Sequence, residues 1–272
     1  MNIFEIVLIQ PILNLLLFFN FIFGGIHLPF SFGFSIVALT VFVRLVLAPL
    51  TASQLKSAAK TAELRPKLAE LSKKHGSDKQ ALARAQMDLY RAHGVNPAAG
   101  CLPLILQIPV FIALYNVLLR VLGNGGNFSD INQLVYSTFL SVGSLDLGFF
   151  GFNLAAKPSD FAKTGFQLLL IPPVTAILQF WQSKLMMPPR QDSSGPSAQK
   201  KSPGDKKPSM EEALTQMQSQ MVWLMPAMIG FFSFGFPVGL SLYWNVFTIF
   251  GIIQQYWISK NFKLAQILKF RK

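Results

Sequence analysis

Residues 32–50 read Phe-Gly-Phe-Ser-Ile-Val-Ala-Leu-Thr-Val-Phe-Val-Arg-Leu-Val-Leu-Ala-Pro-Leu, an apolar stretch with Arg44 inside it. About 12 residues of the stretch precede Arg44, which is roughly 18 Å of helix at 1.5 Å per residue. In a hydrocarbon core of about 30 Å, Arg44 would therefore lie well inside the bilayer. A guanidinium stays charged at cellular pH, and placing it there costs about 2.5–3.5 kcal/mol. The predicted spans contain no Asp or Glu to pair with Arg44, so we expect water or a visiting anion beside it.

The composition is typical of a membrane protein that crosses the bilayer several times. Of 272 residues, 51% are hydrophobic and 13% are charged, and the mean hydropathy is +0.42. These values argue against a soluble domain with an ordinary core. The formal net charge of +12 would suggest a nucleic-acid partner if it covered a soluble surface. The basic residues are instead grouped between apolar spans, so we expect no specific nucleic-acid partner. Cys101 is the single cysteine, which excludes an intrachain disulfide.

The distribution of basic residues predicts the orientation in the membrane. Of 24 Lys and Arg, nine lie in residues 54–95, six in residues 184–216 and five in residues 259–272. By the positive-inside rule these three segments, the C-terminus included, are cytoplasmic. In residues 123–164 two lysines stand against three aspartates, so this segment is expected outside.

The apolar spans and basic groups predict an all-α membrane protein with five transmembrane helices. The expected segments are an outer-face interfacial helix at 1–30, spans at 31–52, 96–122, 165–187, 217–236 and 237–258, a cytoplasmic helical hairpin at 53–95, an external connection at 123–164, a cytoplasmic loop at 188–216 and a basic cytoplasmic tail at 259–272. Residues 1–25 have an alternative as a further full span. The charge distribution opposes it, because the N-terminus would then have to lie on the other side.

The cytoplasmic hairpin rests on apolar residues spaced by three and four on both sides of His75-Gly76-Ser77. Two roles for it stay open. It could lie on the membrane surface, held by anionic lipid, or it could act as a mobile arm that receives a partner.

Polar side chains inside the predicted spans indicate a hydrophilic groove. Besides Arg44 they include Thr40, Gln107, Gln179, Tyr243 and Trp244. Thr40 precedes Arg44 by four residues, so both lie on one helical face. A single amide of this kind is more often a link between helices than a ligand group. Together with an unpaired arginine, these side chains favour a hydrated cavity that receives an anion or a polar segment.

The sequence offers little for catalysis. The three histidines, His27, His75 and His93, fall outside the predicted spans, and there is no His-Glu-x-x-His zinc motif or phosphate-binding glycine loop. Ser35 has no histidine partner at a plausible depth. We therefore expect no enzyme and no cofactor or metal site.

Five motifs follow one another along the chain. They are Val43-Arg44-Leu45 with Pro49-Leu50-Thr51, Met87-Asp88-Leu89-Tyr90 with Gly94-Val95-Asn96-Pro97, Gly100-Cys101-Leu102-Pro103-Leu104, Gln107-Ile108-Pro109-Val110-Phe111-Ile112-Ala113-Leu114-Tyr115, and Phe236-Pro237-Val238-Gly239-Leu240-Ser241-Leu242-Tyr243-Trp244. Gln254-Gln255 ends the last span. In this order the motifs resemble the YidC family of membrane protein insertases, which includes the mitochondrial and thylakoid insertases. The resemblance covers nearly the whole chain from about residue 30.

The resemblance implies a five-span core around a groove that opens to the cytoplasm and the lipid and is closed outside. The family's groove arginine falls on Arg44, its threonine on Thr40 and its aromatic residue on Trp244, whereas Gln179 matches by position in its span only. The implied location is the bacterial plasma (inner) membrane. The implied partners are nascent or newly made membrane proteins and membrane lipids, with the ribosome and the Sec translocon left open.

Two features depart from the family's pattern. The sequence contains neither the large periplasmic domain of Gram-negative members nor the N-terminal lipoprotein cysteine of many Gram-positive ones, so we expect a bacterial member without that domain. The tail at 259–272 is short, with five basic residues among apolar ones. A basic amphipathic membrane anchor accounts for it as well as ribosome docking does.

The main functional hypothesis is an insertase that takes polypeptide segments into the groove and releases them sideways into lipid. The alternative is a small transporter or anion channel with Arg44 as its substrate site. It predicts inverted repeats with broken helices, and the sequence shows no such internal symmetry. A chaperone or assembly factor for other membrane proteins is a third hypothesis, which needs the groove but no translocation.

Overall fold

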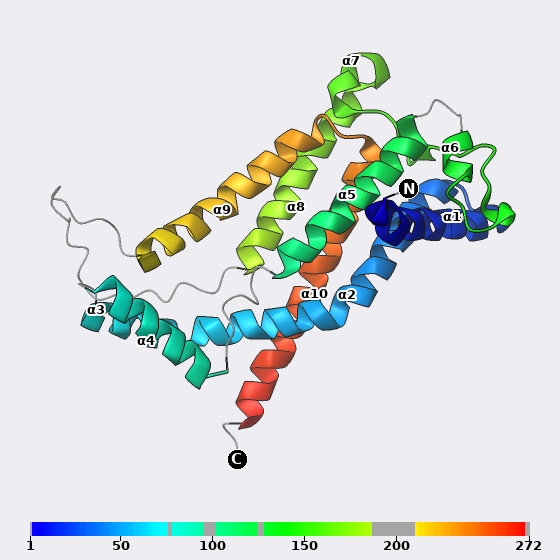
Figure 1. Cartoon of the computed structure of the whole chain (residues 1–272). Coiled ribbons are helices and arrows are strands. Elements are labelled where there is room, and N and C mark those ends of the chain that lie inside the picture. The colour runs from blue at the N-terminus through cyan, green and yellow to red at the C-terminus, as the bar shows by residue number, and fades with distance from the viewer. Residues whose placement is uncertain (1, 76–77, 95–101, 124–127, 187–209, 270–272) are drawn as a thin grey trace.

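The computed structural model describes residues 2–75, 78–94, 102–123, 128–186 and 210–269, and this part of the chain is mostly helical. In chain order its elements are η1 (Glu5–Ile9, a π-helix), α1 (Gln10–Gly25), α2 (Ser31–Glu63), α3 (Arg65–His75), α4 (Lys79–Ala92), α5 (Leu102–Gly123), α6 (Ser129–Asn132), η3 (Thr138–Leu140), β1 (Gly148–Phe149), β2 (Phe152–Asn153), η4 (Pro158–Asp160), α7 (Phe161–Thr164), η5 (Phe166–Leu170), α8 (Ile171–Met186), α9 (Met210–Ser233) and α10 (Val238–Lys269). Figure 1 shows their arrangement.

The long helices form one bundle (Figure 1). Helix α8 packs against both α9 and α10, and α10 packs against α2. Gly230 of α9 permits the close approach to α8, because a Cβ at this position would lie 2.8 Å from the Cβ of Ala176. Residues of α2, α5 and α10 meet in the main core, where Ile36, Leu114 and Leu240 are almost fully buried.

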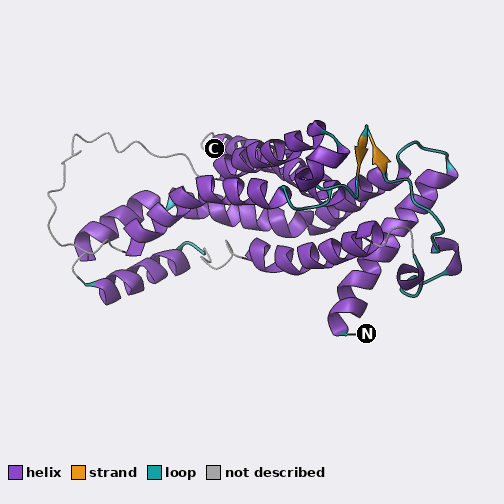
Figure 2. Cartoon of the chain, turned by 90° about the horizontal axis from the view of Figure 1, so that it is seen from above, coloured by secondary structure: helices purple, strands orange, loops and turns teal. Residues whose placement is uncertain are grey.

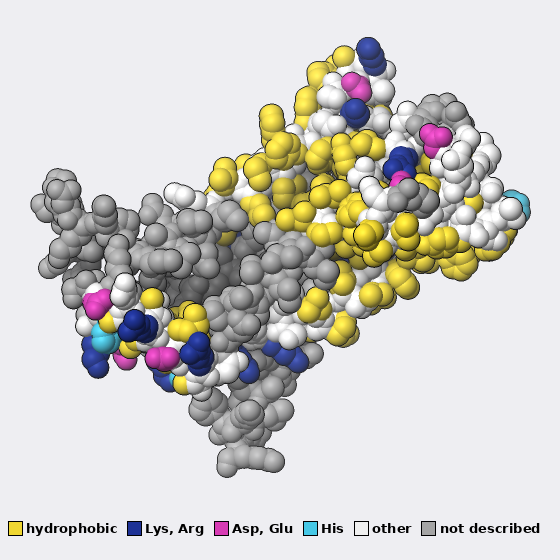
Figure 3. All heavy atoms as spheres, in the orientation of Figure 1, with side chains coloured by type: hydrophobic (Ala, Val, Ile, Leu, Met, Phe, Trp, Pro, Cys, Tyr) yellow, Lys and Arg dark blue, Asp and Glu magenta, His cyan; other side chains and the backbone are white. Residues whose placement is uncertain are grey.

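The surface and the helix lengths are those of an all-α membrane protein. Among the described residues, Glu5–Gly25 and Ser31–Ser57 are long and apolar enough to cross a bilayer, by length and composition alone, and Gln107–Gly123 and Val222–Ser233 are shorter apolar helices. In Figure 3, hydrophobic side chains cover the middle of the visible face, and charged side chains gather toward its two ends. One of these ends carries the α3–α4 pair, which lies far from α1 in Figure 1.

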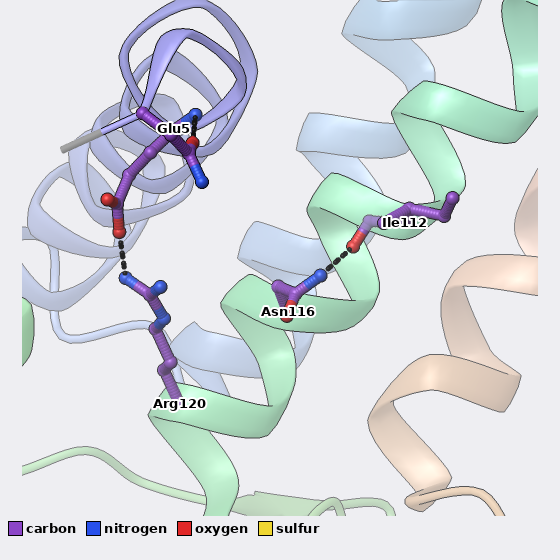
Figure 4. A network of polar contacts seen from close by, with 5 residues as sticks. Glu5, Ile112, Asn116 and Arg120 are labelled. Atoms are coloured by element: carbon purple, nitrogen blue, oxygen red, sulfur yellow. Dashed lines mark hydrogen bonds and ion pairs between the residues drawn. The ribbon is translucent and has the colours of Figure 1, made fainter.

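Helix α1 runs obliquely to the bundle, as the helix that starts at the N-terminus in Figure 2 shows. One face of it enters the main core, where Leu13, Leu16 and Leu17 are buried. Before it, Glu5 forms an ion pair with Arg120 near the end of α5, with 2.8 Å between Oε1 and Nη1 (Figure 4). The N-terminal helix is thus attached to the bundle by both apolar and charged contacts.

The connection between α5 and α8 is hydrogen-bonded to the first residues of α10. The backbone N–H of Gly239 donates to the carbonyl of Leu154, and that of Val238 donates to the carbonyl of Ala156, both at 2.9 Å. Earlier in the same connection, the short antiparallel strands β1 and β2 pair Phe149 with Phe152. Main-chain hydrogen bonds therefore tie together one end of the bundle.

At the end of the bundle near α3 and α4, the boundary between the first span and the hairpin differs from the expected one. The first span was expected to end at residue 52 with the hairpin starting at 53, yet α2 is one helix to Glu63 and changes direction along its length (Figure 1). Pro49 inside α2 accounts for a bend. Helix α2 ends before Arg65 because Pro66 has no backbone N–H to donate to a carbonyl of the preceding turn.

The pair of helices that follows has a small core of its own. Leu64 and Leu68 are buried against Leu89 and Tyr90. Asp78 caps α4, since its Oδ1 accepts from the backbone N–H groups of Gln80 and Ala81. A helical hairpin is therefore present, formed by α3 and α4.

Other expected segments extend or fall outside the described residues. Helix α10 continues from the expected fifth span through the expected tail to Lys269. Residues 187–209, most of the expected loop at 188–216, lie outside the described part, as do residues 95–101 with parts of two motifs.

Candidate functional site

Arg44 lies on α2 with only 6% of its surface exposed. Its Nη2 donates a hydrogen bond to the backbone carbonyl of Phe247 on α10. Its Cζ stands 3.3 Å from the centroid of the Phe247 ring, a cation–π contact. Its Nε is buried without a hydrogen-bond partner, and no Asp or Glu of the described residues forms an ion pair with it. Phe247 thus stabilises the guanidinium only in part.

Gly251 lets three helices meet around this guanidinium. A Cβ at Gly251 of α10 would overlap Nε2 of Gln182 on α8 and would lie 2.7 Å from Nη2 of Arg44 on α2. Any side chain at this position would therefore displace one or both groups. The absence of a Cβ lets an amide and a guanidinium contact the backbone of α10.

A cluster of aromatic, amide and hydroxyl side chains lies within one turn of Phe247 on α10, at Trp244 and Thr248. The indole Nε1 of Trp244 donates to Oε1 of Gln179 on α8 at 3.1 Å, and Thr248 Oγ1 donates to the same oxygen at 3.4 Å. The Trp244 ring meets Phe111 of α5 edge-on, with 5.1 Å between centroids. These contacts connect α5, α8 and α10.

Tyr243 and Gln107 form a second polar contact between α5 and α10. Nε2 of Gln107 donates to the Tyr243 hydroxyl at 3.2 Å, and Tyr243 is 1% exposed. The phenol is therefore held in the interior by an amide from the neighbouring helix. Its ring also packs on Phe247, with 5.7 Å between centroids.

The structure brings most of the predicted groove residues together, in pairs. Gln107 bonds Tyr243 and Gln179 bonds Trp244, while Arg44 contacts Phe247 beside Tyr243. Thr40 is buried, and its hydroxyl donates at 2.6 Å to the Ile36 carbonyl of its own helix. No side-chain hydrogen bond joins Thr40 to the other predicted residues in the described part of the chain.

Sequence reasoning missed Phe247 and Gly251, and it noted Gln182 as a polar residue of its span without including it among the groove residues. A signal for the first two was present, because Tyr243, Phe247 and Gly251 follow one another by four residues and so share one face of α10. Gln182 follows the predicted Gln179 by three residues and shares its face in the same way. Nearer the α3–α4 hairpin, Gln254 of α10 donates to Thr51 Oγ1 of α2 at 2.6 Å.

Several buried polar atoms of this region have no partner within the described chain. They include Ser241 Oγ and Asn245 Oδ1, which lie one turn apart on α10, and Arg44 Nε. A buried polar group left without a hydrogen bond costs about 1–3 kcal/mol. Around α10 the described chain therefore contains buried hydrogen-bonding atoms that none of its own groups pairs with. No cluster of three or more His, Cys, Asp or Glu in the described residues could hold a metal ion.

Comparison with known proteins identifies the family. A family model described as 60Kd inner membrane protein matches residues 22–266. The chain is 34% identical over 254 residues to membrane protein insertase YidC 2 of Bacillus anthracis, a match that covers 92% of this chain and 78% of the relative. The chain belongs to the YidC family of membrane protein insertases.

Other YidC relatives differ in how much of their length the chain spans. It is 33% identical over 234 residues to the insertase YidC of Oceanobacillus iheyensis, covering 85% of this chain and 75% of that protein. It is 30% identical over 259 residues to YidC of Geobacter sulfurreducens, covering 95% of this chain but 38% of that protein. The family model, which matches residues 22–266, covers the whole of α2, α5, α8 and α9. Arg44 and its contacts on α10 therefore lie within the matched region.

Proposed function

We propose that this chain is an energy-independent insertase for small membrane proteins with short translocated tails. It takes a polypeptide segment into a hydrated groove between α2, α5, α8 and α10 and releases it laterally into the bilayer. The observation that carries the proposal is Arg44, a buried guanidinium with an unused N–H and no carboxylate partner in the described chain. An acidic residue of an incoming segment would supply the missing charge.

The proposed topology has five spans, formed by α2, α5, α8, α9 and α10, in the bacterial plasma membrane. The N-terminal helix lies at the outer face, which its oblique course and its contacts with the α5–α8 connection support. The α3–α4 hairpin and the C-terminus are cytoplasmic, because the basic residues concentrate there. Newly made membrane proteins are the proposed clients.

The proposed mechanism joins charge pairing to hydrophobic release. In a partly desolvated groove, attraction between Arg44 and a client carboxylate is stronger than in bulk water. Gln107, Gln179 and the polar edges of Tyr243 and Trp244 hydrate the translocating tail and shorten its path through hydrocarbon. The apolar part of the client then moves into lipid, and its burial at about 25 cal/mol per Å² drives the reaction. No step uses a nucleotide.

The test is insertion of a client with an acidic tail into proteoliposomes that contain Arg44→Ala. Hydrogen bonds to charged groups contribute about 1.5–3 kcal/mol, so we expect the rate to fall at least about tenfold. Arg44→Lys is the matched control, because it keeps the positive charge and should keep more of the rate. A client whose tail carries Asn in place of Asp should respond less to Arg44→Ala. Wild-type insertion of the acidic client by Arg44→Ala would contradict the proposal.

Two further measurements separate the competing functions. Solute flux through liposomes that contain the protein and no client would favour a transporter or anion channel. Crosslinks from position 244 to nascent chains, without protease protection of the translocated tail, would favour an assembly factor.

A further inference from the structure

A hollow on the flank of the bundle has no role in the proposed groove. It lies between the end of α1 and the following helix α2, and it is lined by apolar side chains throughout. Phe23 and Leu28 border it near the α1–α2 turn, and it is lined along α2 by Phe34, Val37, Ala38, Val41, Phe42 and Leu45.

The hollow lies mainly on a different face of α2 from the groove. Phe34, Ala38, Val41 and Leu45 follow one another by four, three and four residues, which makes one stripe along the helix. Thr40 and Arg44 belong to a neighbouring stripe, which the lining residue Val37 borders because it precedes Arg44 by seven residues. Arg44 itself is 6% exposed and contacts α10. A ligand in the hollow would therefore not compete directly with a client at Arg44.

The hollow is continuous with the surface that faces lipid. Phe42 and Leu45, at its inner end, are 45% and 57% exposed, and Val46 outside the lining is 59% exposed, although all three lie in the middle of a membrane-length apolar helix. From Phe34 to Leu45 the helix rises roughly 16 Å at 1.5 Å per residue. This length is close to the roughly 15 Å of hydrocarbon in one leaflet, half of a core of about 30 Å.

We propose that the hollow is a binding site for one acyl chain of a phospholipid. The continuous apolar lining excludes a polar or charged ligand, and its length along α2 fits an acyl chain of one leaflet. The α1–α2 turn places the headgroup beside exposed His27. Assignment of this site to the outer leaflet rests on the orientation in the proposed function. The acyl-chain site itself does not depend on that orientation.

A bound acyl chain would support the position of α1. The two helices already touch through Phe19 and Phe42, whose rings meet edge-on with centroids 6.3 Å apart. The hollow lies beside this contact. Phe23 and Leu28 line it together with residues of α2. An acyl chain there would fill the space between α1 and α2 that these side chains leave open.

The first test measures phospholipid that stays bound after the purified full chain is washed in detergent. The protein is taken from vesicles of phosphatidylethanolamine and phosphatidylglycerol, and retained lipid is determined by phosphate analysis and native mass spectrometry. Ala38→Trp fills the hollow and should lose most of the phospholipid that the wild type retains. Val46→Trp adds the same indole on the exposed surface of α2, outside the lining, and should retain as much as the wild type.

The second test separates a site from the general lipid surroundings. A phospholipid with a diazirine in its acyl chain is incorporated into the vesicles in increasing proportion. Labelling of residues 34–45 should saturate at a low proportion, whereas labelling near Trp223 on α9, which is 69% exposed, should rise in proportion. Non-saturating labelling at both places would overturn the proposal, as would equal lipid retention by folded Ala38→Trp and the wild type.

Two controls keep the result independent of folding and of the insertase proposal. If Ala38→Trp elutes as an aggregate, Val41→Phe replaces it as a smaller filling variant, judged by the same lipid measurement. Arg44→Ala should retain the phospholipid fully, because it leaves the hollow intact. Loss of insertion with retained lipid, or the reverse, would therefore show which of the two proposals has failed.

Discussion

Gly251 is the residue at which the guanidinium, an amide and a helix backbone come closest together. In Gly251→Ala the new Cβ would displace the ends of Gln182 and Arg44, both flexible side chains. Alanine also favours the helix by about 0.5–1 kcal/mol relative to glycine. We therefore expect several-fold slower insertion in proteoliposomes with an unchanged or slightly higher Tm.

The matched control for that substitution is Gly123→Ala at the end of α5, where a Cβ would meet nothing within 4 Å. It should leave the insertion rate unchanged. An equal loss of insertion in both variants would show that the close approach at Gly251 is not what matters.

For single residues, the sequence predicted a buried cation at Arg44 better than it predicted the groups that contact this cation. The spacing of Thr40 and Arg44 and the lack of acidic residues in the spans pointed to an unusual buried cation, and Arg44 is buried without a carboxylate in the described chain. Its contact with Phe247 was not predictable in this way, because the acceptor is a backbone carbonyl, which every residue has.

Among the elements, α1 depends on Asn14, a buried polar residue in an apolar helix. Its Nδ2 donates to the Leu134 carbonyl at 2.9 Å, and its Oδ1 accepts from the Tyr136 N–H at 2.7 Å. Asn14→Leu would leave both backbone groups unpaired, at about 1–3 kcal/mol each. We expect a lower Tm and faster proteolysis of the α5–α8 connection in detergent-purified protein.

Asn20→Leu is the comparison for Asn14→Leu. Asn20 is half-buried on the same helix, and its Oδ1 accepts a longer hydrogen bond, 3.3 Å, from Ser31 Oγ. Its replacement should lower the Tm less. If both variants lose the same stability, α1 is held by its apolar face and the Asn14 contacts add nothing.

The ends of elements were harder to predict than their existence. Apolar composition shows where a helix can lie in hydrocarbon, but α2 and α10 continue beyond the expected spans, as helices with basic residues, to Glu63 and Lys269. Only Pro66, after the expected boundary, marks where α2 ends. The contacts of Asn14 join residues about 120 positions apart, and no local pattern contains such information.

For the whole molecule, the Glu5–Arg120 ion pair gives Arg120 a counter-charge. Arg120 lies near the end of α5 that is proposed to face outward, where the positive-inside rule disfavours arginine. Glu5 lies 2.8 Å away, with 17% of its side chain exposed, and it neutralises that charge. The ion pair joins the N-terminal segment to α5 at the proposed outer end, while the orientation stays a prediction from the distribution of Lys and Arg.

The orientation and the groove can be tested together with single cysteines. Cys101→Ser removes the one native cysteine, and Glu70→Cys, Ser141→Cys and Arg44→Cys are then introduced one at a time. Glu70 on α3 and Ser141 after η3 are exposed, so a membrane-impermeant thiol reagent should label the first from the cytoplasm and the second from outside. Position 44 should react from the cytoplasm alone, since a closed outer end and a groove open to the cytoplasm admit water from one side. Labelling at position 44 from outside would indicate a channel, and no labelling from either side would indicate a dry bundle in which Arg44 serves packing.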